Sequence, residues 1–401
     1  AIEKGAKAVI VHSPKFIAQS SNRNKASFIL VKDTVMALGD IAKFQREKFD
    51  IPIIAVTGSN GKTTAKEMIA QVLSKKFKVL KNIGTQNNQI GLPLALLGLN
   101  SSQSIAVLEI GTNHPGEVEY LAKVASPNIG IITNIGHSHL EYLKNLKGVF
   151  REKITLIKHL KSPPIAILNA DDGLLKRKVV RINRKPIIFG FGIKNRSDFF
   201  ASDIKILDGK IEFLINQKFR FTLKTLGYYN VYNALATVAC ARIFGIEYRD
   251  IISRLLTFNF PQNRLQILEL NNIKFINDTY NSNPVSLKQA LDTLNNFRTK
   301  GRKIFVMGDM LELGTRKELF HHLAGREVAR ICDVFITVGE LSKFAAKSAI
   351  VSGFNVKNIF SCASNLQARD ILFKKISPGP DDIVLVKGSR AMKMEEIIRE
   401  T

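Results

Sequence analysis

The sequence predicts an α/β protein in which mostly parallel sheets carry helices on their faces. Short apolar runs typical of buried strands recur in the first part of the chain, at residues 51–56, 105–109, 129–132, 165–168 and 186–189. Helical stretches lie between several of them, which is the alternation expected of a parallel sheet. A second series of runs follows, at residues 274–277, 303–308, 334–338 and 383–387, alternating with helical stretches at 284–297 and 316–331. We therefore expect a C-terminal Rossmann-like, doubly wound domain after a central parallel-sheet domain.

Three domains are predicted, over residues 1–47, 48–260 and 261–401. The first holds only two expected strands, at 8–11 and 27–31, and a helix at 34–43, so it resembles a remnant of a small α/β domain. The chain also opens on Ala1 in what reads as the end of a helix, so we expect further residues upstream. Short alternating runs over residues 199–225, around Asp208 and Gly209, predict hairpins at an antiparallel edge of the central sheet.

The composition is that of an ordinary globular protein, with 45% hydrophobic and 23% charged residues. No signal peptide or membrane-spanning run of about 18 apolar residues is present. The three cysteines are scattered, at Cys240, Cys332 and Cys362, which argues against a disulfide framework or a zinc site and favours the cytoplasm. We expect a monomer.

A net charge of +25 raises the possibility of a nucleic-acid-binding protein. The lysines and arginines are spread along the chain, however, with only short clusters such as residues 181–185. A basic chain also suits anionic small substrates, because its field steers phosphates inward. We therefore expect no nucleic-acid partner.

A phosphate-binding loop follows the first buried run of the central domain. Its residues are Thr57, Gly58, Ser59, Asn60, Gly61, Lys62, Thr63 and Thr64, and a helix with an apolar face follows over residues 65–76. Backbone N–H groups of such a turn bind phosphate, the lysine reaches the β- and γ-phosphates, and the threonine hydroxyl binds Mg²⁺. The general pattern has Gly where this chain has Val56, so the loop is a short variant. The alternative is a chance glycine turn before a helix.

Polar residues follow two further strands of the same predicted sheet. Glu109 ends the run at 105–109, and His137, His139 and Glu141 follow the run at 129–132. Ligands bind beyond the carboxyl ends of parallel strands, so Glu109 is a candidate Mg²⁺ ligand and one histidine a ligand for a second metal. Taken singly, Glu109 would be a solvated acid and each histidine a hydrogen-bonded structural residue.

An Asn-rich segment, residues 278–284, follows the first strand of the last domain. Asparagine side chains both donate and accept hydrogen bonds, which suits an adenine edge or a peptide. An equally good interpretation is a turn that caps the helix starting at Pro284.

These segments together resemble the Mur ligases, in the same order and over nearly the whole chain. The resemblance runs through residues 57–67, 87–93, 109–117, 133–141, 168–172, 278–284, 308–314 and 387–395. The phosphate loop is common to the Mur ligases and the folylpolyglutamate synthases. The last three segments single out the Mur ligases that add D-alanyl-D-alanine.

The resemblance implies a reaction in which ATP phosphorylates the terminal carboxylate of UDP-MurNAc-tripeptide. The amine of D-alanyl-D-alanine then attacks the acyl phosphate, and the tetrahedral intermediate collapses to the amide. By resemblance, Thr63 and Glu109 would hold the first Mg²⁺ and His139 the second, with Lys62 neutralising the γ-phosphoryl group. Lys153 matches a lysine that is often carbamylated, although Ile154 and Thr155 depart from the pattern that surrounds it, and the alternative is a surface lysine on a helix.

Further roles carry over by resemblance alone. Asn277, Tyr280 and Asn281 match a nucleotide-facing segment, as does Asn283, which is also expected to face substrate together with Asn87 and Asn88. Arg264 matches an arginine that reaches the ATP phosphates, although Asn263 stands where the family has Gly. Asp309 would contact the ribose or act at a hinge, and Ser389 and Arg390 would face the dipeptide or the acyl phosphate. The family's UDP-binding first domain is represented here only by residues 1–47.

Two alternative functions remain open on the sequence. A folylpolyglutamate synthase would share the phosphate loop, but residues 311–314 and 389–392 argue against it. A nucleic-acid-stimulated ATPase would suit the net charge, but the chain has no basic stripe with interleaved aromatic residues.

Overall fold

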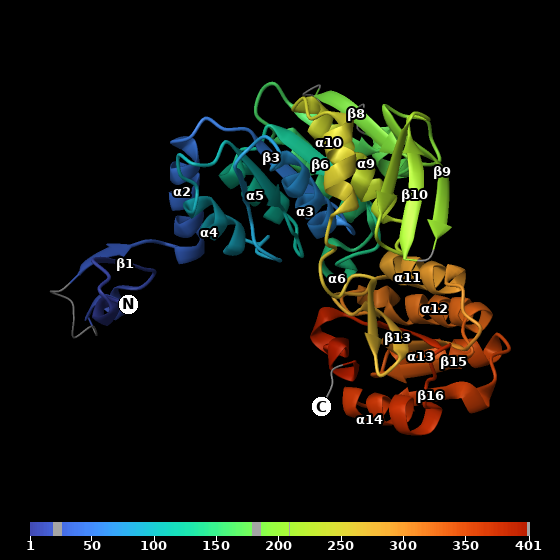
Figure 1. The fold of residues 1–401 in the computed structure, drawn as a ribbon. Coiled ribbons are helices and arrows are strands. Elements are labelled where there is room, and N and C mark those ends of the chain that lie inside the picture. The colour runs from blue at the N-terminus through green and yellow to red at the C-terminus, as the bar shows by residue number, and fades with distance from the viewer. Residues whose placement is uncertain (19–25, 179–185, 208, 399–401) are drawn as a thin grey trace.

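The computed structural model describes residues 1–18, 26–178, 186–207 and 209–398, so the basic cluster at 181–185 and Asp208 lie outside the described residues. Within this part of the chain the strands form three sheets, of two, nine and six strands. Figure 1 shows the small N-terminal pair at one end, the large central sheet, and the C-terminal sheet packed beside it. The predicted α/β class is confirmed.

The N-terminal sheet is a single parallel pair, β1 (Ala8–Val11) and β2 (Ser27–Leu30). Helix α2 (Thr34–Glu47) follows, and its N-terminus is capped by Asp33, whose carboxylate accepts the backbone N–H groups of Val35 and Met36. The buried Arg46 joins this helix to the central domain, because its guanidinium donates to the carbonyl of Ala125.

The central sheet is parallel from β4 to β9 and antiparallel at β10. In spatial order its strands are β11 (Phe219–Leu223), β10 (Lys210–Ile215), β9 (Phe199–Leu207), β8 (Ile187–Gly192), β7 (Ile165–Asn169), β6 (Ile129–Ile132), β3 (Ile53–Thr57), β5 (Ile105–Glu109) and β4 (Val79–Lys81). The predicted hairpin edge is confirmed by the antiparallel pairs β9–β10 and β10–β11. Strand β4 was not predicted, because three residues are too few to show a pattern.

Helices cover both faces of this sheet. Alternate side chains of a strand point to opposite faces, and every residue of β3 is therefore buried. Ile54 and Val56 pack with α3 (Lys62–Leu73) and α9 (Asn230–Ile243), whereas Ile53 and Ala55 pack with α5 (Glu117–Ala125) and α7 (Leu146–Lys158). The other helices of the domain are α4 (Gly91–Leu97), α6 (Leu140–Leu143), α8 (Gly173–Lys178) and α10 (Tyr248–Leu256).

The C-terminal sheet is also covered on both faces. Its spatial order is β12 (Gln266–Leu270), β13 (Ile273–Asp278), β17 (Ile383–Lys387), β14 (Lys303–Gly308), β15 (Val334–Val338) and β16 (Ile359–Cys362). Phe305 and Met307 of β14 face the core under α11 (Pro284–Asn296), α12 (Lys317–Ile331) and α13 (Ser342–Val351). Ile304 and Val306 face the opposite core, which includes α14 (Asn365–Asp370). Only β12 runs antiparallel in this sheet.

No helix among the described residues is long and apolar enough to cross a membrane.

Candidate active site

The phosphate loop connects β3 to α3, and its two glycines are required by its backbone. Gly58 has φ +150°, and a Cβ there would lie 1.9 Å from the hydroxyl oxygen of Thr133. Gly61 has φ +82°, in the left-handed region, and a Cβ there would lie 2.5 Å from Oδ1 of Asn233. Because Gly61 caps the helix, α3 begins at Lys62, three residues before the predicted start. The N–H groups of its first turn are therefore free to bind an anion.

The turn that follows β6 holds this loop in shape. The backbone N–H of Asn60 donates to Oδ1 of Asn134 at 3.0 Å, and its carbonyl accepts the hydroxyl of Thr133 at 2.6 Å. Ser59 donates its hydroxyl to the carbonyl of Gly136 at 3.0 Å. Because these contacts fix the loop from outside its own segment, they lower the entropic cost of ordering it around a phosphate.

Thr63 and Glu109 meet where the predicted Mg²⁺ site lies. Register between β3 and β5 places Glu109 level with Val56, at the base of the loop. The hydroxyl of Thr63 donates to Oε2 of Glu109 at 2.7 Å, and Nδ2 of Asn87 donates to Oε1 at 2.7 Å. Lys62 donates to the carbonyl of Gly58 at 3.0 Å, and burial lowers the pKa of its ammonium, with Glu109 opposing that shift.

A buried lysine supports the strand end that carries Glu109. Lys66 is fully buried and donates to the carbonyl of Asn82 at 2.6 Å. The side chain of Asn82 in turn bonds both the N–H and the carbonyl of Glu109. The strand end that carries Glu109 is therefore fixed by a chain of hydrogen bonds that begins on α3.

A cavity of about 350 Å³ lies between the central and C-terminal domains. Its wall includes most of the predicted site residues: Ser59, Asn60, Gly61, Lys62, Thr63, Thr64, Asn87, Glu109, His139, Arg264, Tyr280, Asn281 and Asn283. The loop thus faces a second domain across a partly open cavity, whose walls shield charges from part of the solvent.

Arg264 of the C-terminal domain reaches the phosphate loop. One of its guanidinium nitrogens donates to the hydroxyl of Thr63 at 3.0 Å. The guanidinium carbon lies 3.8 Å from the centre of the Tyr280 ring, a stacked cation–π contact that holds the side chain in place. The pair brings a fixed positive charge close to where phosphates would bind.

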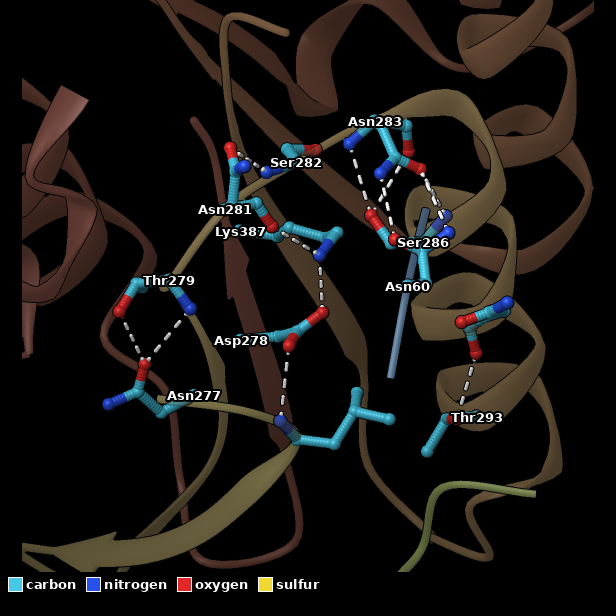
Figure 2. Close-up of polar contacts among 12 residues, drawn as sticks. Asn60, Asn277, Asp278, Thr279, Asn281, Ser282, Asn283, Ser286, Thr293 and Lys387 are labelled. Atoms are coloured by element: carbon cyan, nitrogen blue, oxygen red, sulfur yellow. Dashed lines mark hydrogen bonds and ion pairs between the residues drawn. The ribbon is translucent and has the colours of Figure 1, made fainter. Parts of the chain in front are cut away.

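Two charged residues of the wall were not predicted as site residues. Asp278 ends β13 and Lys387 ends the neighbouring β17, and the strand register pairs them directly. Figure 2 shows the ammonium of Lys387 between the Asp278 carboxylate and the carbonyl of Asn281, to which it donates at 2.9 Å. Burial raises the pKa of Asp278, and Lys387 opposes that shift. The rule that singled out Glu109, an acid at a parallel strand end, applies equally to Asp278.

Asn283 caps the helix that follows it, as the second interpretation of its segment predicts, and the interpretation as a ligand-binding segment stays a prediction. Its side chain accepts the backbone N–H of Ser286 at 2.9 Å and caps α11, which begins at Pro284. The same side chain donates to Oδ1 of Asn60 at 2.8 Å, as Figure 2 shows, and so joins the two domains.

Seven predicted residues do not line the cavity: Gly58, Asn88, Lys153, Asn277, Asp309, Ser389 and Arg390. Several of them make structural contacts instead. Asn88 accepts the N–H of Gly91 at the start of α4, and Asp309 accepts the N–H of Ser342 at the start of α13. Asn277 donates to Oδ1 of Asn263, Ser389 accepts the N–H of Leu311, and Arg390 pairs with Glu395. Their functional roles stay predictions.

Lys153 is not the surface lysine of the alternative interpretation. It lies on α7, is 1% exposed, and its ammonium makes no hydrogen bond or ion pair with any described residue. Burial lowers its pKa well below the ordinary value, and the charge of Lys62 adds to the effect. Burial therefore favours the neutral amine at this position.

His139 lines the cavity, and its Nδ1 lies 2.6 Å from Oε2 of Glu312 in the C-terminal domain. Burial lowers its pKa, the hydrogen bond to Glu312 opposes this, and Lys153 and Lys62 reinforce it. The ring is therefore favoured in its neutral form, with one nitrogen lone pair available.

The donors at Thr63 and Glu109 fit a magnesium ion. Both supply oxygen, and their atoms are close enough to share one cation. Within the described residues, no group of three or more His, Cys, Asp or Glu side chains is arranged to hold a metal. Mg²⁺ is commonly held by one or two protein oxygens together with substrate phosphates and waters.

The fold and cavity define a nucleotide-dependent enzyme built from two α/β domains. Family models agree: the Mur ligase middle domain matches residues 56–241, and the Mur ligase, glutamate ligase domain matches residues 263–390. The chain belongs to the Mur ligase family.

Individual relatives indicate which type of Mur ligase the chain is similar to. A UDP-N-acetylmuramoyl-tripeptide–D-alanyl-D-alanine ligase from Buchnera aphidicola subsp. Baizongia pistaciae is 38% identical, over 100% of this chain and 85% of its own length. The structure of MurF from Acinetobacter baumannii has a TM-score of 0.88 and 28% identity, covering 99% of this chain and 91% of that one. The MurF ligase from Thermotoga maritima in complex with ADP has a TM-score of 0.85 and 27% identity, covering 99% and 88%.

Proposed function

We propose that this protein is the ATP-dependent ligase that joins D-alanyl-D-alanine to UDP-MurNAc-tripeptide, a step of peptidoglycan precursor synthesis in the cytoplasm. The relatives that it matches over nearly its whole length carry this activity in their names. The observation that carries the proposal in this chain is the cavity in which the phosphate loop of one domain faces Arg264 and Lys387 of the other.

The first step requires two anions to meet, the γ-phosphate of ATP and the substrate carboxylate. Lys62, at the start of α3, and Arg264, which reaches the loop from the C-terminal domain, both supply positive charge. Thr63 and Glu109 would hold Mg²⁺, which would polarise the phosphoryl oxygens and neutralise the charge that develops on them.

Two residues are proposed to serve a second metal site. His139 would provide a neutral ring nitrogen, and Lys153 would provide a carbamate oxygen after its amine reacts with CO₂. Burial lowers the pKa of Lys153 and so favours the neutral, nucleophilic amine that this reaction needs. A carbamate would also place an anion where the charge of Lys62 acts.

The second step requires the acyl phosphate to meet an amine and not water. Contacts between the domains, such as Asn283 with Asn60 and Arg264 with Thr63, join the two walls of the cavity beside the loop. Exclusion of bulk water would protect the acyl phosphate from hydrolysis until the dipeptide amine attacks.

Omission of single substrates tests the proposal. Phosphate release from ATP should require both UDP-MurNAc-tripeptide and D-alanyl-D-alanine, and Lys62→Ala should abolish it, whereas Lys78→Ala on the exposed surface should not. Equal release without the dipeptide would contradict the proposal, as would Lys62→Ala activity within about tenfold of wild type. Turnover with folate and glutamate, or stimulation by DNA or RNA, would support the two alternative functions.

A further inference from the structure

The turn that follows β14 docks onto α6 of the central domain. The backbone N–H of Glu141 donates to the carbonyl of Glu312 at 3.2 Å. Gly314 packs closely against the backbone of the same helix, since a Cβ on it would lie 3.3 Å from Cα of Glu141. Both Glu312 and Gly314 have φ of +60°, so this turn adopts a backbone conformation that favours glycine and is held there by its contacts.

Apolar packing joins the same two segments. Leu140 and Leu143 of α6 are buried in the core of the C-terminal domain, in one cluster with Met310 and Leu313. A short helix of the central domain therefore completes the apolar core of its neighbour. We expect its position to depend on the docking of the C-terminal domain.

The turn is itself fixed from within the C-terminal domain. The N–H of Met310 donates to Nε2 of the buried His321 at 3.0 Å, and the N–H of Leu311 donates to Oγ of Ser389 at 2.8 Å. Glu312 thus projects from a rigid support, as a positioning group requires.

His139 stands at the start of α6 and connects this docking surface to the cavity. It has φ +52°, lines the cavity, and places Nδ1 at 2.6 Å from the Glu312 carboxylate. Glu312 does not line the cavity. An ionised carboxylate can only accept a hydrogen bond, so Nδ1 carries the proton and Nε2 carries the lone pair. Nε2 has no partner among the described residues.

We propose that Glu312 is a positioning residue that fixes the tautomer and orientation of His139, so that Nε2 faces the cavity as a ligand only when the C-terminal domain is docked. The part of this proposal that concerns a metal rests on the proposed function. A carboxylate behind a ligating histidine raises the basicity of the ring and sets its direction. Domain closure and assembly of the reaction centre are thereby a single event.

The first test determines which ring nitrogen of His139 carries the proton in the protein without metal or nucleotide. Heteronuclear NMR of the imidazole nitrogens, with His139 assigned from the spectrum of His139→Gln, should show the wild-type proton on Nδ1. Glu312→Ala should move the population toward the Nε2–H tautomer, and Glu312→Gln, whose amide oxygen still accepts, should give an intermediate result. The exposed Glu318→Gln, an identical charge change in the same domain, should match wild type. An unchanged His139 signal in Glu312→Ala would overturn the proposal.

The second test measures the number and affinity of bound Mn²⁺ ions by electron paramagnetic resonance. The protein is titrated in the presence of a non-hydrolysable ATP analogue and UDP-MurNAc-tripeptide. Glu312→Ala should weaken the weaker Mn²⁺ site about 10–100-fold and leave the tighter site unchanged. The change should vanish in a His139→Ala background, because Glu312 acts only through that ring. Equal weakening in both backgrounds would overturn the proposal.

Failure of the proposed function has a different signature. In that case the wild-type protein would not form the amide, although the His139 tautomer would still respond to Glu312→Ala. Should Glu312→Ala prove unfolded by circular dichroism, Glu312→Gln carries the same comparisons.

Discussion

Replacement of Lys387 by Met should destabilise the C-terminal domain far more than loss of a surface lysine. Lys387 is 1% exposed and Asp278 is 13% exposed, so the substitution leaves an ionised carboxylate with little solvent to stabilise it. Breaking a buried pair in this way costs about 3–5 kcal/mol. We expect about 3 kcal/mol, at the lower end, because both groups line a cavity that admits water.

Urea unfolding followed by circular dichroism measures this loss. The matched control is Lys343→Met, whose ion pair with Glu340 has a similar geometry at 2.7 Å but is exposed, so its loss should cost less than about 1 kcal/mol. The double variant Asp278→Asn with Lys387→Met should recover most of the stability, because no buried charge remains. A loss from Lys387→Met no larger than that from Lys343→Met would refute the reasoning, as would a double variant no better than the single one.

The same variant should show a stronger pH dependence of its stability than wild type, with the same sign. Burial already raises the pKa of Asp278, and removal of the Lys387 cation would raise it further. A carboxyl whose pKa is higher in the folded state contributes stability below its unfolded pKa and loses it as the pH rises through the folded pKa. The deficit of Lys387→Met relative to wild type should therefore grow from acid to neutral pH, and a deficit that shrinks over that range would contradict the assignment.

Three further predictions concern the cavity. Gly61→Ala should reduce nucleotide affinity at least tenfold by isothermal titration, because its φ of +82° and the 2.5 Å approach of a Cβ to Asn233 strain the loop; unchanged affinity would contradict this. Arg264→Lys should lower kcat/KM by roughly 10–100-fold, since lysine keeps the charge but not the planar stacked donor; activity equal to wild type would show that charge alone matters. Lys153→Met should abolish the dependence of wild-type activity on dissolved CO₂, measured in degassed buffer with and without bicarbonate, and a wild type insensitive to CO₂ would exclude the carbamate.

Much of the fold was predictable because its signals are local. Runs such as residues 129–132 and 334–338 are buried on both faces, so they appear as continuous apolar segments. Strand β12 was missed because its side chains are only partly buried and it lies at a sheet edge. The N-terminus of α3 was placed three residues late, since Lys62 and the two threonines after it were assigned to the loop and also form the first turn of the helix.

The site was predictable where one segment carries its own chemistry, as the loop at Gly58 to Thr64 does. Contacts between segments that are far apart in the chain could not be predicted from the sequence. The pairing of Asp278 with Lys387 depends on strand order in the C-terminal sheet, and the contact of His139 with Glu312 joins residues of two domains. Ser389 was predicted to face substrate, yet its hydroxyl accepts the N–H of Leu311 and so supports the turn that carries Glu312.

The central claim is that the phosphoryl group of ATP is transferred to the carboxylate of the tripeptide before the amide forms. The most direct measurement uses UDP-MurNAc-tripeptide with ¹⁸O in its terminal carboxylate, followed by mass spectrometry of the inorganic phosphate released. Transfer through an acyl phosphate predicts that one ¹⁸O atom appears in each phosphate, because the carboxylate oxygen leaves with phosphorus when the amine attacks. Phosphate without label, formed together with the amide product, would contradict the account.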